Sequence, residues 1–226
     1  MRPRVLLAWS SGKDSAWALH TLRQAGAVEV VALLTTFNQA FDRVAMHAVR
    51  RSLVQAQAAA VGLPLIGVPL PWPCSHDDYA QAMRTALASA IAHYAITQVA
   101  FGDLFLEDVR RYRESRMQDI GLTPLFPLWG LATATLAREM VRTGLQARIT
   151  CIDPRYLDSA LAGRRFDDQF LDELPAGVDA CGENGEFHTF VHDGPMFRQP
   201  IPVQAGAVVL RDGFVFADLM LAGGGC

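Results

Sequence analysis

The chain has 226 residues, of which 51% are hydrophobic and 19% are charged, and its formal net charge is −3. This is the composition of a globular protein of one or two domains, and the slight negative charge argues against a basic surface for nucleic acid or acidic membranes. The 4 cysteines include no CxxC pair, and no apolar run approaches the roughly 18 residues of a membrane span. We therefore expect a reduced, cytoplasmic protein with no membrane association.

The first hundred residues alternate between apolar runs and segments with helical spacing. The apolar runs predict strands at 4–10, 28–37, 64–71 and 98–103. The segments between them predict helices over 14–26, 43–63 and 77–94. Because the strands are apolar on both faces, the fold class predicted is α/β, with a parallel sheet covered by helices on both sides.

After about residue 120 the pattern changes. The two prolines of 122–130 indicate a linker or an edge strand, and a helix is predicted over 133–143. A strand at 147–153 and a helical segment over 156–174, broken near Gly163, follow. The alternation over 208–221 predicts a hairpin that turns at Asp212-Gly213. This part of the chain is predicted to be a smaller α+β unit.

A polar turn, Ser10-Ser11-Gly12-Lys13-Asp14-Ser15, joins the first strand to the first helix. Such a turn exposes backbone N–H groups at the positive end of a helix, which favours an anion. The spacing is not that of a Walker A loop, since there is one glycine and Asp14 follows the lysine. The alternative is a plain helix start with Ser10 or Ser11 as the N-cap.

Two further polar groups end predicted strands of the same sheet. Thr35 and Thr36 end the second strand, and Gly102 and Asp103 end the fourth. Ligands of parallel sheets bind outside the carboxyl ends of the strands, so these residues are candidates for a nucleotide site. Asp103 would suit a metal or a ribose hydroxyl, whereas ordinary β-propensity explains the threonines equally well.

Charged residues follow Asp103 at helical spacing. Positions 103, 107, 110 and 114 would share one face of a helix, and Arg113 lies beside them. Carboxylates and guanidinium groups in such a stripe would suit a phosphate and a carboxylate substrate. The alternative is a solvated face with ion pairs between successive turns.

The densest polar cluster is 183–189, Glu-Asn-Gly-Glu-Phe-His-Thr. In a strand, Glu186 and His188 would point to the same face, and we expect both in one cleft. There they would bind ammonia, act as a base toward ammonium, or orient a carboxylate. The alternative is a glycine-containing turn into an edge strand. Cys181 stands next to this cluster and is expected to be a small buried residue.

Three strings resemble known families. SSGKDS (10–15) resembles the pyrophosphate-binding loop, S-G-G-x-D-S, of the N-type ATP pyrophosphatases. The block FGDLFLEDVRRYRESRMQDIGLTPLFPLWG (101–130) resembles the G-D…R…R-E…G-L…P-L-W block of the diphthine–ammonia ligase family. GENGEFHTFVHDGPMF (182–197) closely resembles that family's E-x-G-E-[FY]-H-T-[FLV]-V-x-D-G-P signature. Order and spacing agree too, so the resemblance covers nearly the whole chain.

This resemblance implies an ATP pyrophosphatase domain of the HUP-like, Rossmann-like kind over 1–120 and a C-terminal substrate domain over 121–226. It implies that ATP adenylates a carboxylate and that ammonia then displaces AMP. ATP would be held by Ser10, Ser11, Gly12, Lys13, Asp14, Ser15, Thr35, Thr36, His47 and Gly102, with Asp14 as a Mg²⁺ partner. The catalytic candidates are Asp103, Arg113, Glu114, Glu183, Glu186 and His188.

The acceptor carboxylate stays open at this point. In the family's named case it is diphthine, a modified histidine of translation elongation factor 2, so the acceptor is a modified protein side chain or a small molecule. A nucleotide-dependent tRNA thiolation enzyme and a nucleotide-binding regulator without turnover are the alternatives. The first needs a working cysteine, and the second has no use for the 183–189 cluster. The sequence also leaves a homodimer open.

Overall fold

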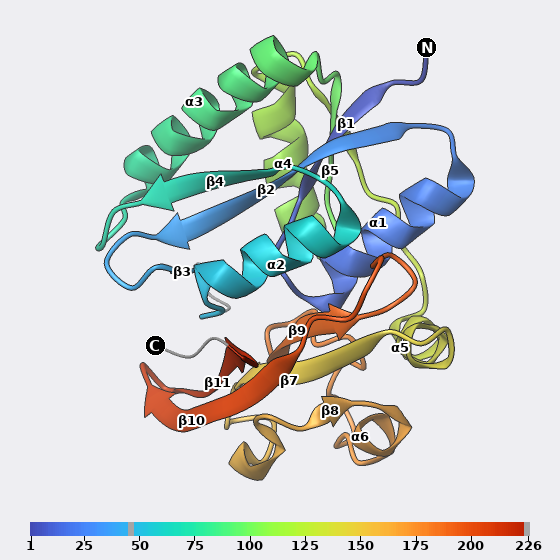
Figure 1. Ribbon diagram of the computed structural model, residues 1–226, viewed down its shortest axis with the longest axis vertical. Helices are drawn as coiled ribbons and strands as arrows, with labels where there is room; N and C mark the ends of the chain where they lie inside the picture. Colours follow the sequence, from blue (N-terminus) through green and yellow to red (C-terminus); the bar gives the residue numbers. More distant parts are fainter. Residues whose placement is uncertain (45–47, 224–226) are drawn as a thin grey trace.

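The computed structural model describes residues 1–44 and 48–223 and contains two sheets, one above the other in Figure 1. In the first, the parallel strands are β1 (Arg4–Ala8), β2 (Glu29–Asn38), β4 (Leu65–Leu70), β5 (Gln98–Ala100) and β6 (Thr123–Leu125). They lie in the order β4-β2-β1-β5-β6, and the two-residue strand β3 (Arg43–Val44) pairs antiparallel with the end of β2. The parallel α/β sheet expected from the apolar runs is confirmed.

Helices cover both faces of this sheet. Helices α3 (His76–Tyr94) and α4 (Glu107–Gln118) pack on one face, where Leu87 and Met117 join a core with strand residues such as Val99. Helices α1 (Lys13–Ala25) and α2 (Arg51–Val61) pack on the other face. The core on that second face also contains Phe190 of the second sheet, so the two sheets share one hydrophobic core.

The second sheet is antiparallel. Its strands are β7 (Gln146–Ile152), β8 (Arg165–Phe166), β9 (Phe187–Asp193), β10 (Val203–Arg211) and β11 (Phe214–Leu221). Helices α5 (Thr133–Arg142) and α6 (Asp168–Asp172) accompany it. The predicted hairpin is confirmed: β10 and β11 pair antiparallel, and Asp212 and Gly213 turn with φ of 52° and 83°.

Salt bridges connect the two sheets in addition to the hydrophobic core that they share. Asp218 of β11 accepts hydrogen bonds from Arg43 at 2.8 Å and from Arg50 at 2.6 Å. Burial would raise the pKa of Asp218, but the hydrogen bonds from Arg50 and Arg43 lower it to about 2. The second sheet is therefore fastened to the start of α2.

Two predicted helices are wrong in extent. The helix expected from residue 43 begins at Arg51, because Arg43 and Val44 pair with β2 instead. The segment 156–174 is a 3₁₀ turn (Ser159–Leu161), strand β8 and the short α6, rather than one interrupted helix. The capping residue Asp167 starts a new helix there: its carboxylate accepts a hydrogen bond from the backbone N–H of Phe170 at 2.9 Å.

The edge-strand interpretation of 122–130 is confirmed by β6, which extends the first sheet beyond β5. The division of the chain at residue 120 stays a prediction, as does the cytoplasmic location. In the described ranges, 1–44 and 48–223, none of the helices combines the length and the apolar character that crossing a membrane requires.

Candidate active site

A cavity of about 560 Å³ opens at the carboxyl ends of β1, β2 and β5. It lies where a parallel sheet is expected to bind its ligand, and its size is that of a small-molecule site. One wall is the turn into α1, and the opposite wall is the segment from Cys181 to Glu183 together with the start of β9. Two sequence regions about 170 residues apart thus meet across the cavity.

The start of α1 points toward this cavity. Ser10, Gly12, Lys13, Asp14 and Ser15 all line it, while Ser11 is fully buried beneath them with φ of 73°. The N-cap is Gly12, and it has no side-chain cap hydrogen bond, so the alternative in which Ser10 or Ser11 caps the helix is wrong.

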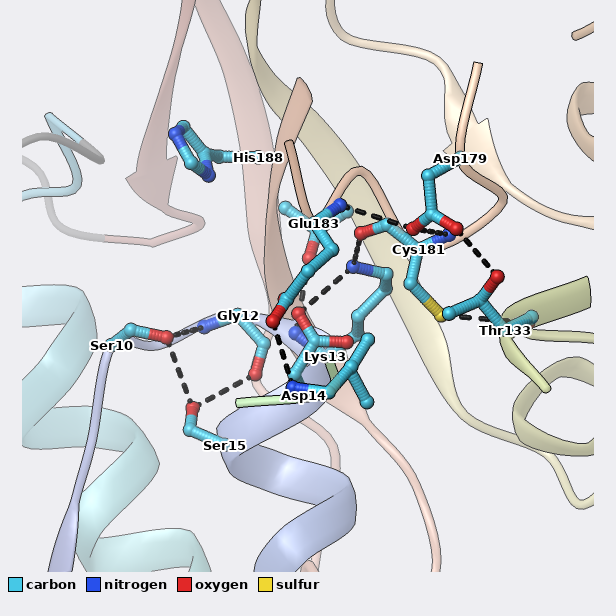
Figure 2. A network of polar contacts seen from close by, with 12 residues as sticks. Ser10, Gly12, Lys13, Asp14, Ser15, Thr133, Asp179, Cys181, Glu183 and His188 are labelled. Atoms are coloured by element: carbon cyan, nitrogen blue, oxygen red, sulfur yellow. Dashed lines mark hydrogen bonds and ion pairs between the residues drawn. The ribbon is translucent and has the colours of Figure 1, made fainter. Parts of the chain in front are cut away.

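The two outer serines hold the turn in shape (Figure 2). The Ser10 hydroxyl lies 3.2 Å from that of Ser15, which in turn donates to the carbonyl of Gly12 at 3.0 Å. Both serines line the cavity. The predicted role of this turn as an anion site agrees with its geometry, because a helix N-terminus and hydroxyl groups face one space.

Lys13 points inward. Its ammonium lies 3.0 Å from the carboxylate of Asp14 and donates to the backbone carbonyl of Cys181 (Figure 2). It also lies 5.2 Å from the ring centre of Phe187. Burial alone would lower the pKa of Lys13, but Asp14, with Cys181 and Glu183, outweighs burial and raises it. Lys13 is therefore charged, and it joins the turn to the opposite wall.

Asp14 keeps one oxygen for a ligand. Its Oδ2 pairs with Lys13, whereas its Oδ1 is buried and has no hydrogen-bond partner among the described residues. The Ser11 hydroxyl is in the same condition. Burial raises the pKa of Asp14 above its ordinary value, although Lys13 acts in the opposite direction. Orphaned buried oxygens are costly unless something binds them, and of these two residues only Asp14 lines the cavity. Asp14 Oδ1 therefore fits a site for a hydrated cation, and the Ser11 hydroxyl is not part of it.

Glu183 is the carboxylate on the opposite wall. It accepts a hydrogen bond from the backbone N–H of Leu104 at 2.7 Å. Burial raises its pKa to about 7; that hydrogen bond opposes the rise, and the charges of Asp14 and Asp103 add to it. Glu183 therefore changes its protonation state near neutral pH, which suits a group that exchanges a proton with a substrate.

The loop that carries Glu183 is held from within. The Asp179 carboxylate accepts from the backbone N–H groups of Cys181 at 3.0 Å and Glu183 at 3.1 Å. Glu186 is buried, and its carboxylate accepts from the N–H of Asp179 at 3.1 Å and from the backbone and side chain of Asn184 at 3.0 and 2.9 Å. Glu186 thus binds the loop and is absent from the cavity lining.

The structure does not place Glu186 and His188 in one cleft as expected. His188 lines the cavity, and Figure 2 shows its ring apart from the Lys13–Asp14 pair. Burial lowers the pKa of His188 to about 4; Lys13 contributes to the fall and Glu186 opposes it. Its imidazole is therefore neutral at pH 7 and can orient a polar group without adding charge.

Asp103 and Arg113 form a bidentate pair at the end of β5, with distances of 2.5 and 3.2 Å, and both line the cavity. The Arg113 guanidinium also covers the ring of Phe101 at 4.5 Å. The adjacent Gly102 is required by packing, since a Cβ there would lie 2.9 Å from the backbone carbon of Asp14. The segment that follows β5 therefore packs closely against the start of α1.

The expected helical stripe is only partly formed. Asp103 precedes α4, which begins at Glu107, so it does not share the helix with the later positions. Glu114 pairs with Arg110 at 2.7 Å on the outer face and is not among the cavity residues. Glu107 pairs with Arg111 at 3.7 Å, with both side chains exposed, which is the solvated arrangement that was the alternative.

The nucleotide candidates at β2 also divide. Thr36 lines the cavity. Thr35 is buried and donates its hydroxyl to the carbonyl of Trp9 at 2.7 Å, so it joins two strands. His47 lies outside the described residues.

Two buried residues that hydrogen-bond the turn were not identified as site residues from the sequence. Thr189 accepts a hydrogen bond from the N–H of Lys13, and Gln57 binds the carbonyl of Ser11. Thr189 belongs to the quoted 182–197 string, which was a usable signal. Gln57 is one of two glutamines in α2, and its spacing from Leu53, Val54 and Val61 places it on the apolar face, unlike the exposed Gln55. That spacing was a usable signal that Gln57 is buried, but it does not show what Gln57 contacts.

Among the described residues, the cysteine that lines the cavity is Cys181, and its thiol is not activated. Burial raises the pKa of Cys181 far above its ordinary value, although Lys13 opposes this, and burial raises the pKa of Cys151 to about 12. Across residues 1–44 and 48–223, no group of three or more His, Cys, Asp or Glu side chains is arranged to hold a metal ion. A metal at this site would therefore rely on oxygens of its ligand besides one protein carboxylate.

A parallel sheet with a helix N-terminus facing a cavity at its carboxyl edge is the architecture of the nucleotide-binding α/β class. Comparison with known families identifies which one: the chain belongs to the diphthamide synthase family. Residues 3–124 match the diphthamide synthase N-terminal domain, and residues 132–216 match the diphthamide synthase C-terminal domain.

Curated relatives agree along nearly the full chain. Diphthine–ammonia ligase of Danio rerio is 27% identical over 96% of this chain and 92% of its own length. The human protein of the same name is 28% identical over 96% of this chain and 88% of its own. A shorter match, 33% identical over 50% of this chain, is to the Rattus norvegicus protein. The chain is accordingly an ATP-dependent ligase that forms a carbon–nitrogen bond.

Proposed function

We propose that the chain adenylates a carboxylate with ATP, releases pyrophosphate, and forms an amide when ammonia displaces AMP. The observation that carries this proposal is that one cavity joins three parts: an anion-binding helix start, a carboxylate with a free oxygen, and a carboxyl group that titrates near pH 7. The helix start would bind phosphate, the carboxylate would hold a magnesium ion that neutralises phosphate charge, and the carboxyl group would transfer a proton.

The phosphates are assigned to the turn at residues 10–15. The start of α1 supplies backbone donors there, and Ser10 and Ser15 supply hydroxyl groups. The adenine is assigned to the apolar end of the same cavity, where Leu34, Met83 and Phe101 line the space beside Thr36. The cavity volume of about 560 Å³ suits a ligand of this size.

Magnesium is assigned to Asp14. This ion prefers hard oxygen ligands and is commonly held by one or two carboxylates together with phosphate oxygens and water. Asp14 Oδ1 meets that need because it is buried and has no hydrogen-bond partner within the described residues. When bound, magnesium would neutralise phosphate charge. Lys13 keeps Asp14 oriented by holding its other oxygen.

Ammonia is assigned to the Glu183 side of the cavity. Asp14 and Asp103 place negative charge near Glu183, which attracts ammonium. With a pKa of about 7, Glu183 takes a proton from ammonium and leaves neutral ammonia as the nucleophile. Arg113 and the neutral His188 line the same space and are assigned to the acceptor carboxylate.

The acceptor is proposed to be a diphthine-like carboxylate, because the curated relatives are named diphthine–ammonia ligases. A small-molecule carboxylate remains the second candidate. The thiolation alternative lacks support, since the thiol next to the cavity, Cys181, is buried and its pKa is raised. A regulator without turnover would gain nothing from a carboxyl group tuned to pH 7.

Product analysis tests the reaction class. The protein is incubated with Mg·ATP, ammonium and a pool of carboxylates, and the nucleotides are separated. AMP with pyrophosphate is expected, and both should disappear in Asp14→Asn, whereas the exposed Asp108→Asn serves as the matched control and should keep the activity. ADP with phosphate would overturn the pyrophosphatase assignment. Tight ATP binding without any product would leave two explanations, a missing macromolecular acceptor or the regulator. Glu183→Gln in a cellular assay separates them, because the regulator would not depend on this carboxyl group.

A further inference from the structure

The first helical N–H group of α1 is capped from the other end of the chain. Gly12 stands at the N-cap and has no side chain to accept a hydrogen bond. The N–H of Lys13 donates instead to the hydroxyl of Thr189 in β9, at 3.0 Å and across 176 residues of sequence. A Cβ at Gly12 would lie 3.2 Å from the Thr189 carbonyl, so β9 packs directly against the turn.

A single buried amide ties the turn to the same strand. Gln57 of α2 is fully buried, and its Nε2 donates to the carbonyl of Ser11 at 3.0 Å and to that of Val191 at 2.6 Å. Its Oε1 accepts from the indole N–H of Trp9 at 2.8 Å. Both amide protons and the amide oxygen are therefore used, and they join β1, the turn and β9.

The residue at the centre of these contacts adopts a costly conformation. Ser11 has φ of 73°, in the left-handed region that a serine seldom adopts. Its carbonyl accepts from Gln57 and also from the N–H of Val191 at 3.1 Å. Such a conformation persists only where the surroundings impose it, and here both donors come from outside the turn.

We propose that Thr189 and Gln57 are positioning residues that hold the phosphate-binding turn in its active shape from behind. This inference rests on the proposed assignment of the ATP phosphates to residues 10–15. Thr189 fixes the first turn of α1 and Gln57 fixes Ser11, so together they set where the N–H groups of the turn point. Gln57 is absent from the cavity lining, whereas Thr189 is part of it, and for both the effect on the turn needs no contact with the nucleotide.

The test compares the binding of Mg·ATP with that of AMP by calorimetry in Thr189→Val and Thr189→Ser. AMP lacks the β and γ phosphates of ATP, so its binding depends less on the turn and reports mainly on the rest of the site. Thr189→Val, which keeps the shape and loses the hydroxyl, should weaken Mg·ATP about threefold to tenfold, as expected for one lost hydrogen bond. AMP binding should change less than about twofold, and Thr189→Ser should restore ATP binding.

Gln57→Met, which keeps the side-chain length, provides the second test, with Gln55→Met on the exposed face of α2 as its control. Gln57→Met should lower the ATP-to-AMP affinity ratio, and Gln55→Met should not. If either Thr189→Val or Gln57→Met melts earlier yet keeps the wild-type ratio, the residue is merely structural and the inference is wrong. If the wild-type protein binds ATP no better than AMP, the proposed phosphate site fails as well.

Discussion

Glu183 and Glu186 stand three positions apart in the same loop and have opposite surroundings. Glu186 is buried and accepts three hydrogen bonds from the loop that it closes. Glu183 accepts one well-formed hydrogen bond, lines the cavity, and has a pKa raised to about 7. Two carboxylates of one polar cluster can therefore have different roles. Glu186 stabilises the loop by hydrogen bonds, and the loop places Glu183 in the cavity.

Removing the charge of Glu183 is the largest expected effect on activity. Glu183→Gln should reduce amide formation by about a hundredfold or more, the usual loss when a general base is removed. The free energy of unfolding should be unchanged or slightly higher at pH 8, because burial disfavours the ionised Glu183 in the folded state. Steady-state assays and urea unfolding measure the two quantities, and a stability loss equal to that of Glu186→Ala would erase the distinction.

Glu186→Ala should have the opposite profile. It leaves the N–H groups of Asp179 and Asn184 without their acceptor, and the expected loss in the free energy of unfolding is roughly 2–4 kcal/mol. Glu186→Gln, which keeps one oxygen, should lose less. Urea unfolding gives the free energies, and activity per folded molecule of Glu186→Gln should stay within a few-fold of wild type. A hundredfold loss in that variant would make Glu186 catalytic after all.

The pH profile sharpens the contrast further. Because the pKa of Glu183 is about 7, activity at a fixed, subsaturating concentration of ammonium should rise about tenfold from pH 6 to pH 8. The same group should make the folded state less stable as the pH rises from about 4.5 to 7, since the unfolded chain ionises first. Glu183→Gln should lack the step in activity, and a step that persists in this variant would belong to another group.

The smallest effect is expected at a third glutamate. Glu114 pairs with Arg110 on the outer face of α4, where both side chains are partly exposed. Such an ion pair contributes about 0.3–0.5 kcal/mol to the free energy of unfolding. Glu114→Gln should therefore lose little stability, and its activity should stay within about twofold of wild type. A large loss in the product assay would return Glu114 to the catalytic group in which the sequence placed it.

The sequence predicted the sheet and the location of the site well, because apolar runs and the polar residues that end them are local signals. Ser10, Asp14 and Gly102 were placed at one edge of the sheet, and they line one cavity together with Glu183, which the sequence assigned only to a separate polar cluster. The division between Glu183 and Glu186 could not be predicted from spacing. It depends on which carboxylate the loop turns inward, and Asp179 and Asn184 decide that only once the loop is folded.

The same limit applies to the start of α2 and to Gln57. Helical spacing extends back to residue 43, but pairing of Val44 with Phe37 of β2 takes that segment into the sheet. Gln57 and Gln55 have the same side chain. The hydrogen bonds of Gln57 to Ser11 and Val191 form only when these distant segments meet in the folded chain. Contacts between segments distant in the sequence are the hardest feature to predict from a single sequence.

The cap that Thr189 provides has a consequence for how the protein is made. Residues 10–15 leave the ribosome 176 residues before their capping partner. The first sheet can gather its strands during that interval, but the turn acquires its final hydrogen bonds only when β9 has been synthesised and docked. With the phosphates held as proposed, nucleotide binding would be coupled to the completion of the second sheet, and a nascent chain that stops short of β9 would lack the hydrogen bonds that fix this turn.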